Sequence, residues 1–121
     1  MATARAESVE VLTNNYDNMR HGANLRETVL HTANVAPQTF GRIFSYEVDG
    51  PVYAQPLLAA NIATQAGGTL DVVYIVTGSN SVYAFNAQSK DKAALWSRRL
   101  AQLPQGTTAA TSGILSTPVI D

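Results

Sequence analysis

The sequence predicts an all-β fold of short antiparallel strands, and three observations support this prediction. From Phe40 onward, β-branched and aromatic residues occur in short runs that Gly, Asn, Ser and Pro interrupt, which is typical of strands and turns. The runs at 72–76 and 82–85 are apolar on successive residues, so we expect protein to cover both faces of their sheet. The third observation is an internal repeat.

The repeat consists of two pairs of similar phrases. GPVYAQPLL at 50–58 aligns with SGILSTPVID at 112–121 when Pro56 is placed on Pro118, an offset of 62 residues. GRIFSYEV at 41–48 aligns with AALWSRRL at 93–100 at an offset of 52, and the Pro-, Gly- and Thr-rich stretch 103–112 accommodates the difference. Spacing of about 50 residues indicates a repeat array whose units cannot bury their apolar faces alone. We therefore expect the chain to stop where a further repeat begins.

Within this repeat, the residue pattern predicts five strands in order. They are expected at 41–48, 52–59, 71–77, 81–86 and 94–100. Gly67-Gly68 is expected to form a turn, and Gly78-Ser79-Asn80 a tight hairpin, because Gly and Asn adopt positive φ most readily. The brevity of the strands favours antiparallel neighbours.

Residues 1–39 are expected to be a lead-in that is mostly loop. A short strand is predicted at 8–13, and Asn24 with Glu27 predicts one short capped helix that ends at Leu30. Ala4-Arg5-Ala6 before Glu7 has the small-x-small spacing of a signal-peptidase site, but an ordinary Ala-rich N-terminus is the favoured interpretation.

Composition excludes several classes of partner and chemistry. A net charge of −1 with 14% charged residues gives no basic surface for nucleic acid. The longest apolar run, 72–76, is far shorter than the roughly 20 residues of a membrane-spanning helix, so no membrane span is expected. Because the chain has no cysteine, disulfides, thiolate nucleophiles and cysteine-ligated metals are excluded, while the compartment stays open.

Few residues are candidates for chemistry, and each has a structural interpretation that we favour. His21 and His31 are the only histidines, so solvated or locally bonded side chains are expected instead of a metal site. The oxygen-bearing group 14–18 lacks the spacing of a calcium loop and is expected to cap turns; its members are Asn14, Asp17 and Asn18.

The remaining polar candidates are also assigned structural roles. Single acidic residues at strand ends or turns are expected to be solvated: Asp71, Asp91 and Asp121. Ser112 and Thr117 have no evident base or orienting acid, so neither is expected to be a nucleophile. Arg98-Arg99 is expected to mark a solvent-facing rim. No catalytic or metal-binding residue is therefore assigned, and no cofactor-binding residue is identified.

Four pieces of sequence together resemble the repeats of the pyrroloquinoline-quinone-like (quinoprotein) β-propeller family. In order, they are Ala54-Gln-Pro-Leu57, Val73-Tyr-Ile75, Val82-Tyr-Ala-Phe-Asn-Ala87 and Leu95-Trp96. The stretch 14–35 also resembles the lead-in before the first blade of bacterial members. The chain departs from the family pattern at Asn86, where the family has Asp, and at Ser89-Lys-Asp-Lys92, which replaces a Thr-Gly turn.

The resemblance implies a partial β-propeller with four-stranded antiparallel blades of the quinoprotein type over residues 40–121. It implies a clasp strand at 41–48, one blade at 52–100 and the first strand of the next blade at 114–120. Trp96 and Phe44 are then expected to pack against neighbouring blades, each contributing on the order of 2 to 3 kcal/mol. The implied partners are the remaining blades of a longer chain or copies of itself, since one blade leaves apolar faces and open edges in water.

Three functional hypotheses follow. The favoured one is a non-catalytic propeller segment that acts as a scaffold or binding module in a larger protein, with no cofactor of its own. The alternative is the N-terminal part of a pyrroloquinoline-quinone-dependent dehydrogenase, for which the resemblance implies the quinone and calcium on the propeller axis and a carboxylate base. The third is an independent small β-domain that self-associates. A fold alone does not decide among them. The resemblance further implies a periplasmic or secreted location.

Overall fold

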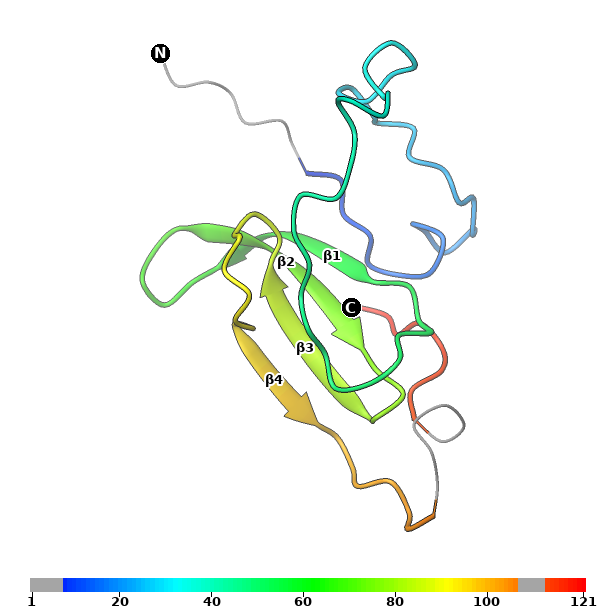
Figure 1. The fold of residues 1–121 in the computed structure, drawn as a ribbon, viewed down its shortest axis with the longest axis vertical. Coiled ribbons are helices and arrows are strands. Elements are labelled where there is room, and N and C mark those ends of the chain that lie inside the picture. Colours follow the sequence, from blue (N-terminus) through cyan, green and yellow to red (C-terminus); the bar gives the residue numbers. More distant parts are fainter. Residues whose placement is uncertain (1–7, 107–112) are drawn as a thin grey trace.

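The computed structural model describes residues 8–106 and 113–121, and these form one open, four-stranded antiparallel sheet (Figure 1). Its strands are β1 (Leu57–Ala63), β2 (Thr69–Val76), β3 (Ser81–Asn86) and β4 (Trp96–Arg99). Their spatial order follows the sequence, β1-β2-β3-β4, and the described part of the chain contains no helix. The all-β, antiparallel prediction is confirmed.

Both predicted turns are present. Gly67 and Gly68 have φ of 83° and 91° between β1 and β2, a conformation that glycine adopts without steric cost. Between β2 and β3, the backbone N–H of Asn80 donates to the carbonyl of Thr77 at 3.1 Å, and Asn80 has φ 62°. Asn is among the residues that tolerate this region best. These two turns set the register of the two hairpins.

The first strand is displaced from its predicted range. Instead of covering 52–59, β1 begins at Leu57 and runs to Ala63. Pro51 and Pro56 have no N–H to donate to a ladder, which explains why pairing begins only after the second proline. The expected strand at 94–100 is likewise shorter, 96–99, whereas β2 and β3 match their predictions within two residues.

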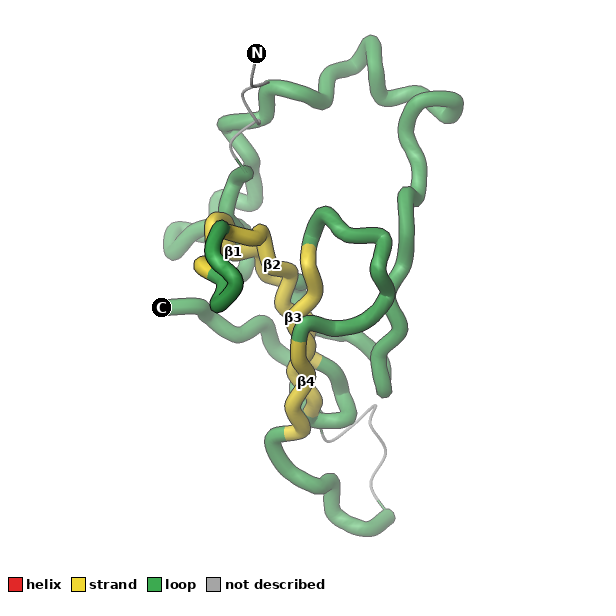
Figure 2. Tube along the Cα trace, turned by 90° about the vertical axis from the view of Figure 1, so that its left-hand side faces the viewer, coloured by secondary structure: helices red, strands yellow, loops and turns green. Residues whose placement is uncertain are grey.

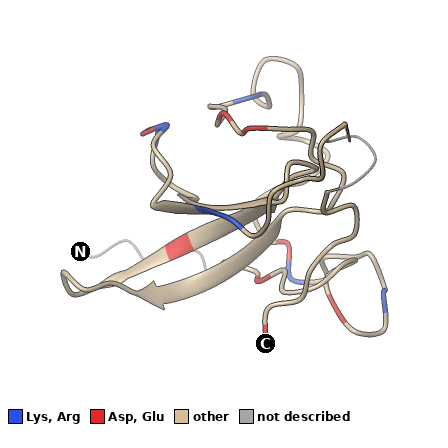
Figure 3. Ribbon diagram, turned by 90° about the horizontal axis from the view of Figure 1, so that it is seen from below, with Lys and Arg blue, Asp and Glu red and all other residues tan. Residues whose placement is uncertain are grey.

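The register defines two faces of the sheet. Face A carries one row of directly paired side chains: Leu57, Tyr74, Ala84 and Trp96. Face B carries Leu58, Val73 and Phe85, because neighbouring residues of a strand point to opposite sides. Leu57 and Phe85 are each only 1% exposed, so both faces contribute to the core. The strands hold one acidic residue, Asp71, and two basic ones, Arg98 and Arg99 (Figure 3).

Residues 41–48, expected to be a clasp strand, are not part of the sheet. They are extended, and among the described residues no backbone hydrogen bond joins them to a strand. Part of this segment crosses face B (Figure 1), where the ring of Tyr46 stacks on Phe85 with a centroid distance of 4.3 Å. Residues 44–49 are named the N-terminal cover below. The alternating residue pattern of this segment specifies an extended chain. However, side-chain contacts attach the segment to the sheet, and in the described chain no ladder of backbone hydrogen bonds does so.

Residues 114–120, expected to be the first strand of a second blade, are also not a strand. Residues 113–121, named the C-terminal cover, lie over face A. The N–H of Ile114 donates to the Thr77 carbonyl at 3.3 Å, and the N–H of Ile120 donates to the Leu12 carbonyl at 2.9 Å. These isolated bonds do not make a ladder. Seen from the side in Figure 2, chain outside the strands lies on both sides of the sheet.

The lead-in forms turns and contacts one end of the sheet. In place of the predicted strand at 8–13, only Val11 pairs with Leu58, through two backbone hydrogen bonds of 2.8 and 2.9 Å. The predicted helix is absent. The Glu27 carboxylate accepts the N–H groups of Val29 and Leu30 at 2.7 and 2.8 Å, so a side chain satisfies them locally in a turn. Ala4-Arg5-Ala6 lies outside the described residues.

Candidate functional site

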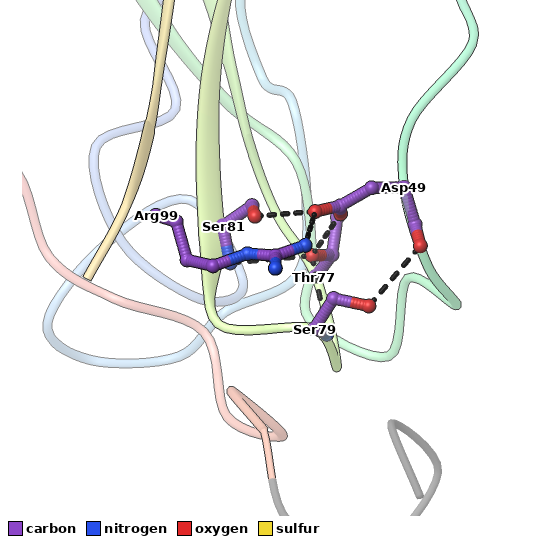
Figure 4. Close-up of polar contacts among 5 residues, drawn as sticks. All are labelled: Asp49, Thr77, Ser79, Ser81 and Arg99. Carbon is purple, nitrogen blue, oxygen red and sulfur yellow. Dashed lines mark hydrogen bonds and ion pairs between the residues drawn. The ribbon is translucent and has the colours of Figure 1, made fainter. Parts of the chain in front are cut away.

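The most extensive side-chain cluster joins the N-terminal cover to the sheet around Asp49 (Figure 4). The Thr77 hydroxyl donates to Asp49 Oδ1 at 2.8 Å. Asp49 Oδ2 accepts the Ser81 hydroxyl and, at 3.0 Å, the Arg99 guanidinium. The Ser79 hydroxyl donates to the Asp49 carbonyl at 3.1 Å. One carboxylate thus connects the cover, the β2–β3 turn, the start of β3 and the end of β4.

Local structure explains why these groups meet. Thr77 and Ser81 are buried at the two ends of the β2–β3 turn, and buried hydroxyls need hydrogen-bond partners. Ser81 pairs directly with Arg99 across β3 and β4, which places the guanidinium beside the same carboxylate. Thr77 Oγ1 also accepts the N–H of Ser81 at 3.3 Å and so stabilises the turn itself. The cluster is therefore a consequence of turn geometry and strand register.

The electrostatics of the cluster favour an ionised Asp49. Its side chain is 25% exposed. Burial alone would raise the pKa of Asp49, but hydrogen bonds from Ser81, Thr77 and Arg99, with the charge of Arg99, lower that pKa below its ordinary value of 3.8. A carboxylate with a lowered pKa is a weak proton acceptor at neutral pH. The arrangement is suited to holding chain segments together.

A second buried carboxylate, Asp71, lies at the start of β2. It is 3% exposed and accepts the Ser8 hydroxyl, the N–H of Asn61 at 3.1 Å and Gln88 Nε2 at 3.3 Å. The expectation that Asp71 is solvated is wrong. The ladder between β1 and β2 is irregular between Ala59 and Ile62, and Asn61 there has φ 57° and donates its N–H to this carboxylate.

The histidines lie where local bonding was expected. His21 Nδ1 is 2.8 Å from Asp17 Oδ2, and this hydrogen bond lowers the pKa of Asp17. Asp17 Oδ1 accepts the N–H of His21 at 3.3 Å, so the predicted turn-capping role of Asp17 is confirmed. The N–H of His31 donates to the Asn34 side chain at 2.9 Å. Within residues 8–106 and 113–121, no group of three or more His, Cys, Asp or Glu side chains could hold a metal ion.

The other sequence candidates have mixed outcomes. Asp91 is exposed and accepts the N–H of Ala93 at 3.1 Å, as expected of a turn residue. Arg98 is solvent-exposed as predicted, whereas Arg99 also forms the ion pair with Asp49. The hydroxyl of Thr117 accepts the N–H of Gln55 at 2.8 Å. Asn14, Asn18 and Asp121 are exposed, and Ser112 lies outside the described residues.

The two aromatic residues expected at blade interfaces differ in burial. Phe44 is half-buried, with its ring centroid 5.3 Å from that of Tyr46 in the N-terminal cover. Trp96 is 48% exposed on face A, with its ring centroid 6.0 Å from that of Tyr74. The indole therefore has one packed side and one side that the described chain leaves open.

Comparisons with known proteins give no relative from which a function could be transferred: no family model, no curated protein and no solved structure matches this chain. In the part of the chain that the structure describes, no helix is long and apolar enough to cross a membrane. We therefore infer function from the contacts of the chain itself.

Proposed function

We propose that this chain is a non-catalytic segment of a quinoprotein-like β-propeller. It serves as a scaffold or binding module, together with the remaining blades of a longer chain or with copies of itself. One observation carries the proposal. Gln55 and Thr117 are 62 residues apart, the offset of the internal repeat, and the N–H of Gln55 donates to Thr117 Oγ1 at 2.8 Å. Equivalent positions of the two repeat phrases therefore touch.

Contact between equivalent positions is what a ring of repeats requires. In a propeller, each blade packs on its neighbours around a common axis, so corresponding residues of successive units lie side by side. Both phrases also bond to the same β2–β3 turn. The N–H of Gly78 donates to the Pro51 carbonyl at 2.8 Å, and the N–H of Ile114 donates to the Thr77 carbonyl at 3.3 Å. Two successive repeat starts thus meet at one turn.

The second pair of repeat phrases supports the same arrangement. Residues 41–48 align with 93–100, and the first of these phrases packs on face B through Tyr46 and Phe85. In the second phrase, the residue aligned with Phe44 is Trp96, which lies half-exposed on face A. In this unit, face B packs against the N-terminal cover. By the same arrangement, face B of a following unit would pack against Trp96.

An exposed apolar side chain on the face A side also favours additional protein there. Leu100 lies near Tyr74 and Val82 and is 60% exposed, and exposed apolar surface of this kind marks interaction sites. A periplasmic or secreted location, which the family resemblance implies, belongs to the same proposal.

The test against the dehydrogenase alternative is a titration of the purified chain with pyrroloquinoline quinone and calcium, followed by the absorbance of the quinone. We expect no saturable change. Saturable binding by this chain would overturn the non-catalytic proposal.

The test against an independent β-domain is sedimentation velocity over a range of concentrations. We expect the chain to associate and the Trp96→Asp variant to associate less, because the substitution places a charge on the open part of face A. Leu25→Asp is the matched control, since Leu25 is a residue of the lead-in that is 91% exposed. A compact monomer that neither substitution changes would contradict the proposal.

A further inference from the structure

The two edges of the sheet differ in how they are closed. At the β1 edge, Val11 forms two backbone hydrogen bonds with Leu58, and the Glu10 carboxylate accepts the N–H of Ala60 at 3.1 Å. At the opposite edge, all four residues of β4 are exposed, and in the described chain no strand lies beyond it (Figure 1). An open edge offers a row of backbone N–H and C=O groups to another extended chain.

The open edge is also where positive charge gathers. The ten residues 90–99 contain half of the chain's 8 lysines and arginines, although the whole chain has a net charge of −1. They are Lys90, Lys92, Arg98 and Arg99, with Asp91 as the single acidic residue among them. Figure 3 shows basic residues on this strand and on the loop that leads to it. The Arg98 side chain makes no contact with a carboxylate in the described part of the chain.

These charges select the kind of strand that can pair with β4. A second copy pairing in parallel through the same edge would place the arginines of both copies side by side, and like charges there destabilise a sheet. In antiparallel pairing of the whole strand, Arg98 would face Ser97. Arg99 would face Trp96, so neither arginine would gain a carboxylate. An extended segment with carboxylates would instead place opposite charges beside these arginines. On face A, Trp96 and Arg98 are two residues apart, so the complementary segment carries an apolar residue and an acidic residue at the same spacing.

We propose that the open edge of β4 is a docking site for an extended acidic peptide segment, which adds a fifth strand to the sheet. Its backbone pairs with β4, its carboxylates pair with Arg98 and the lysines of the preceding loop, and an apolar side chain packs on Trp96. The inference gives a partner to the binding role proposed above and rests on it. The peptide pairs with the backbone edge of β4, whereas stacking of units uses the faces of the sheet, and the two surfaces share Trp96.

The test is a titration of the full chain with a short Val-Thr-Glu-Thr repeat peptide, in which Val and Glu are two residues apart on one face as Trp96 and Arg98 are, with the matching peptide that has Lys in place of Glu as control. Trp96 is the only tryptophan, so its fluorescence reports directly on β4. We expect a saturable change with the Glu peptide alone, weakened by added salt. Hydrogen exchange of the β4 amides is expected to slow in the complex.

Charge reversal makes the test specific. Arg98→Glu should weaken Glu-peptide binding by about tenfold or more and should permit binding of the Lys peptide. Arg26→Glu is the matched control, because Arg26 is an exposed residue of the lead-in, and it should leave both titrations unchanged. Equal binding of both peptides, equal effects of the two substitutions, or tighter binding of a single-stranded oligonucleotide would overturn the inference. The quinone titration and the association measured with Trp96→Asp are separate measurements, so failure of this inference can be distinguished from failure of the proposed function.

Discussion

The two faces of the sheet are covered by segments of the same kind but of different chemistry. On face B, the N-terminal cover is fixed by directional contacts. Tyr46 stacks on Phe85 and donates its hydroxyl to the Asn86 carbonyl at 2.6 Å, and Asp49 binds Thr77, Ser81 and Arg99. On face A, the C-terminal cover leaves a cavity of about 420 Å³ that is lined mainly by apolar side chains, among them Leu57, Tyr74, Val76, Val82, Ile114 and Pro118.

This difference shows which face is complete. Hydrogen bonds and ring stacking fix one position of the N-terminal cover, because each contact requires a particular geometry. Apolar contact is not directional, and on the face A side Trp96 and Val119 stay 48% and 61% exposed. Under the proposed function, face B shows how two units meet, and face A is the surface that a following unit completes.

The largest effect is expected from Phe85→Ala on face B. Phe85 is buried and stacks with the rings of Tyr46 and Tyr83, so its removal leaves a cavity that the strands cannot close. We expect the free energy of unfolding, measured with urea, to fall by about 4 kcal/mol. Val119→Ala in the C-terminal cover is the control and should cost less than about 0.5 kcal/mol. Equal losses would remove the distinction between the two faces.

A smaller effect is expected where each cover meets the β2–β3 turn. A Cβ on Gly113 would overlap the carbonyl of Gly78, which is backbone, whereas a Cβ on Gly50 would overlap the hydroxyl of Ser79. The hydroxyl can rotate away and the carbonyl cannot. We expect Gly113→Ala to lower stability by about 2 kcal/mol and Gly50→Ala by roughly half of that, in thermal unfolding. A larger cost at Gly50 would contradict this contact geometry.

Asp49→Asn tests whether polar contacts hold the N-terminal cover on face B. Losing a charged acceptor for two buried hydroxyls should cost about 1 to 2 kcal/mol at neutral pH, measured by urea unfolding. Because the pKa of Asp49 is lower in the folded chain than its ordinary value of 3.8, its contribution is fully present above about pH 4 and is lost as the pH falls through the folded pKa.

When the pH falls from 4 to strongly acid conditions, the Asn variant should therefore lose less stability than the parent. The acid-induced loss that remains in the variant comes from Asp17 and Glu27, whose pKa values are also lowered. Asp91→Asn, in an exposed turn, is the control and should keep the parent's pH dependence. An identical acid profile for Asp49→Asn and the parent would show that this carboxylate does not hold the cover.

The smallest effect is expected from Tyr46→Phe. The substitution keeps the stack on Phe85 and removes only the hydroxyl that donates to the Asn86 and Ser89 carbonyls, at a cost of about 1 kcal/mol. Burial raises the pKa of Tyr46 above its ordinary value of 10.0, so the neutral phenol contributes stability below pH 10 that is lost as the pH rises through the folded pKa. The free energy of unfolding at pH 7 and pH 11 measures the contribution of the hydroxyl and its loss at high pH, with exposed Tyr53→Phe as the control. A larger loss than for Phe85→Ala would reverse the proposed ranking.

The parts of the fold that the sequence predicts are those that local information determines. The strands β2 and β3 and both turns follow from apolar runs and from Gly and Asn at positive φ. Residues 41–48 and 114–120 were expected to be strands because their patterns specify an extended chain. Whether an extended chain joins a sheet depends on a backbone partner elsewhere, and neither segment has a ladder of such bonds.

The polar clusters could not be predicted for a related reason. Asp49, Thr77 and Arg99 are distant in the sequence. The register of β3 and β4 places Arg99 opposite Ser81, and the path of the N-terminal cover brings Asp49 to them. The hydroxyls at 77, 79 and 81 around one turn were the available signal. Asp71 is buried because a strand irregularity directs Asn61 toward it, and no residue pattern indicates that irregularity.

The most direct measurement is a disulfide cross-link between the two repeat phrases. The chain has no cysteine, so Gln55→Cys with Thr117→Cys introduces the only possible pair at equivalent repeat positions. Since the backbone N–H of Gln55 donates to the Thr117 hydroxyl oxygen at 2.8 Å, the two residues are neighbours, and mild oxidation should link this pair more readily than a pair on opposite faces. Glu47→Cys with Thr117→Cys, which places the cysteines in the covers of opposite faces, is the control and should stay reduced. No intramolecular bond in the first pair, or equal yields in both, would contradict the account that equivalent repeat positions meet.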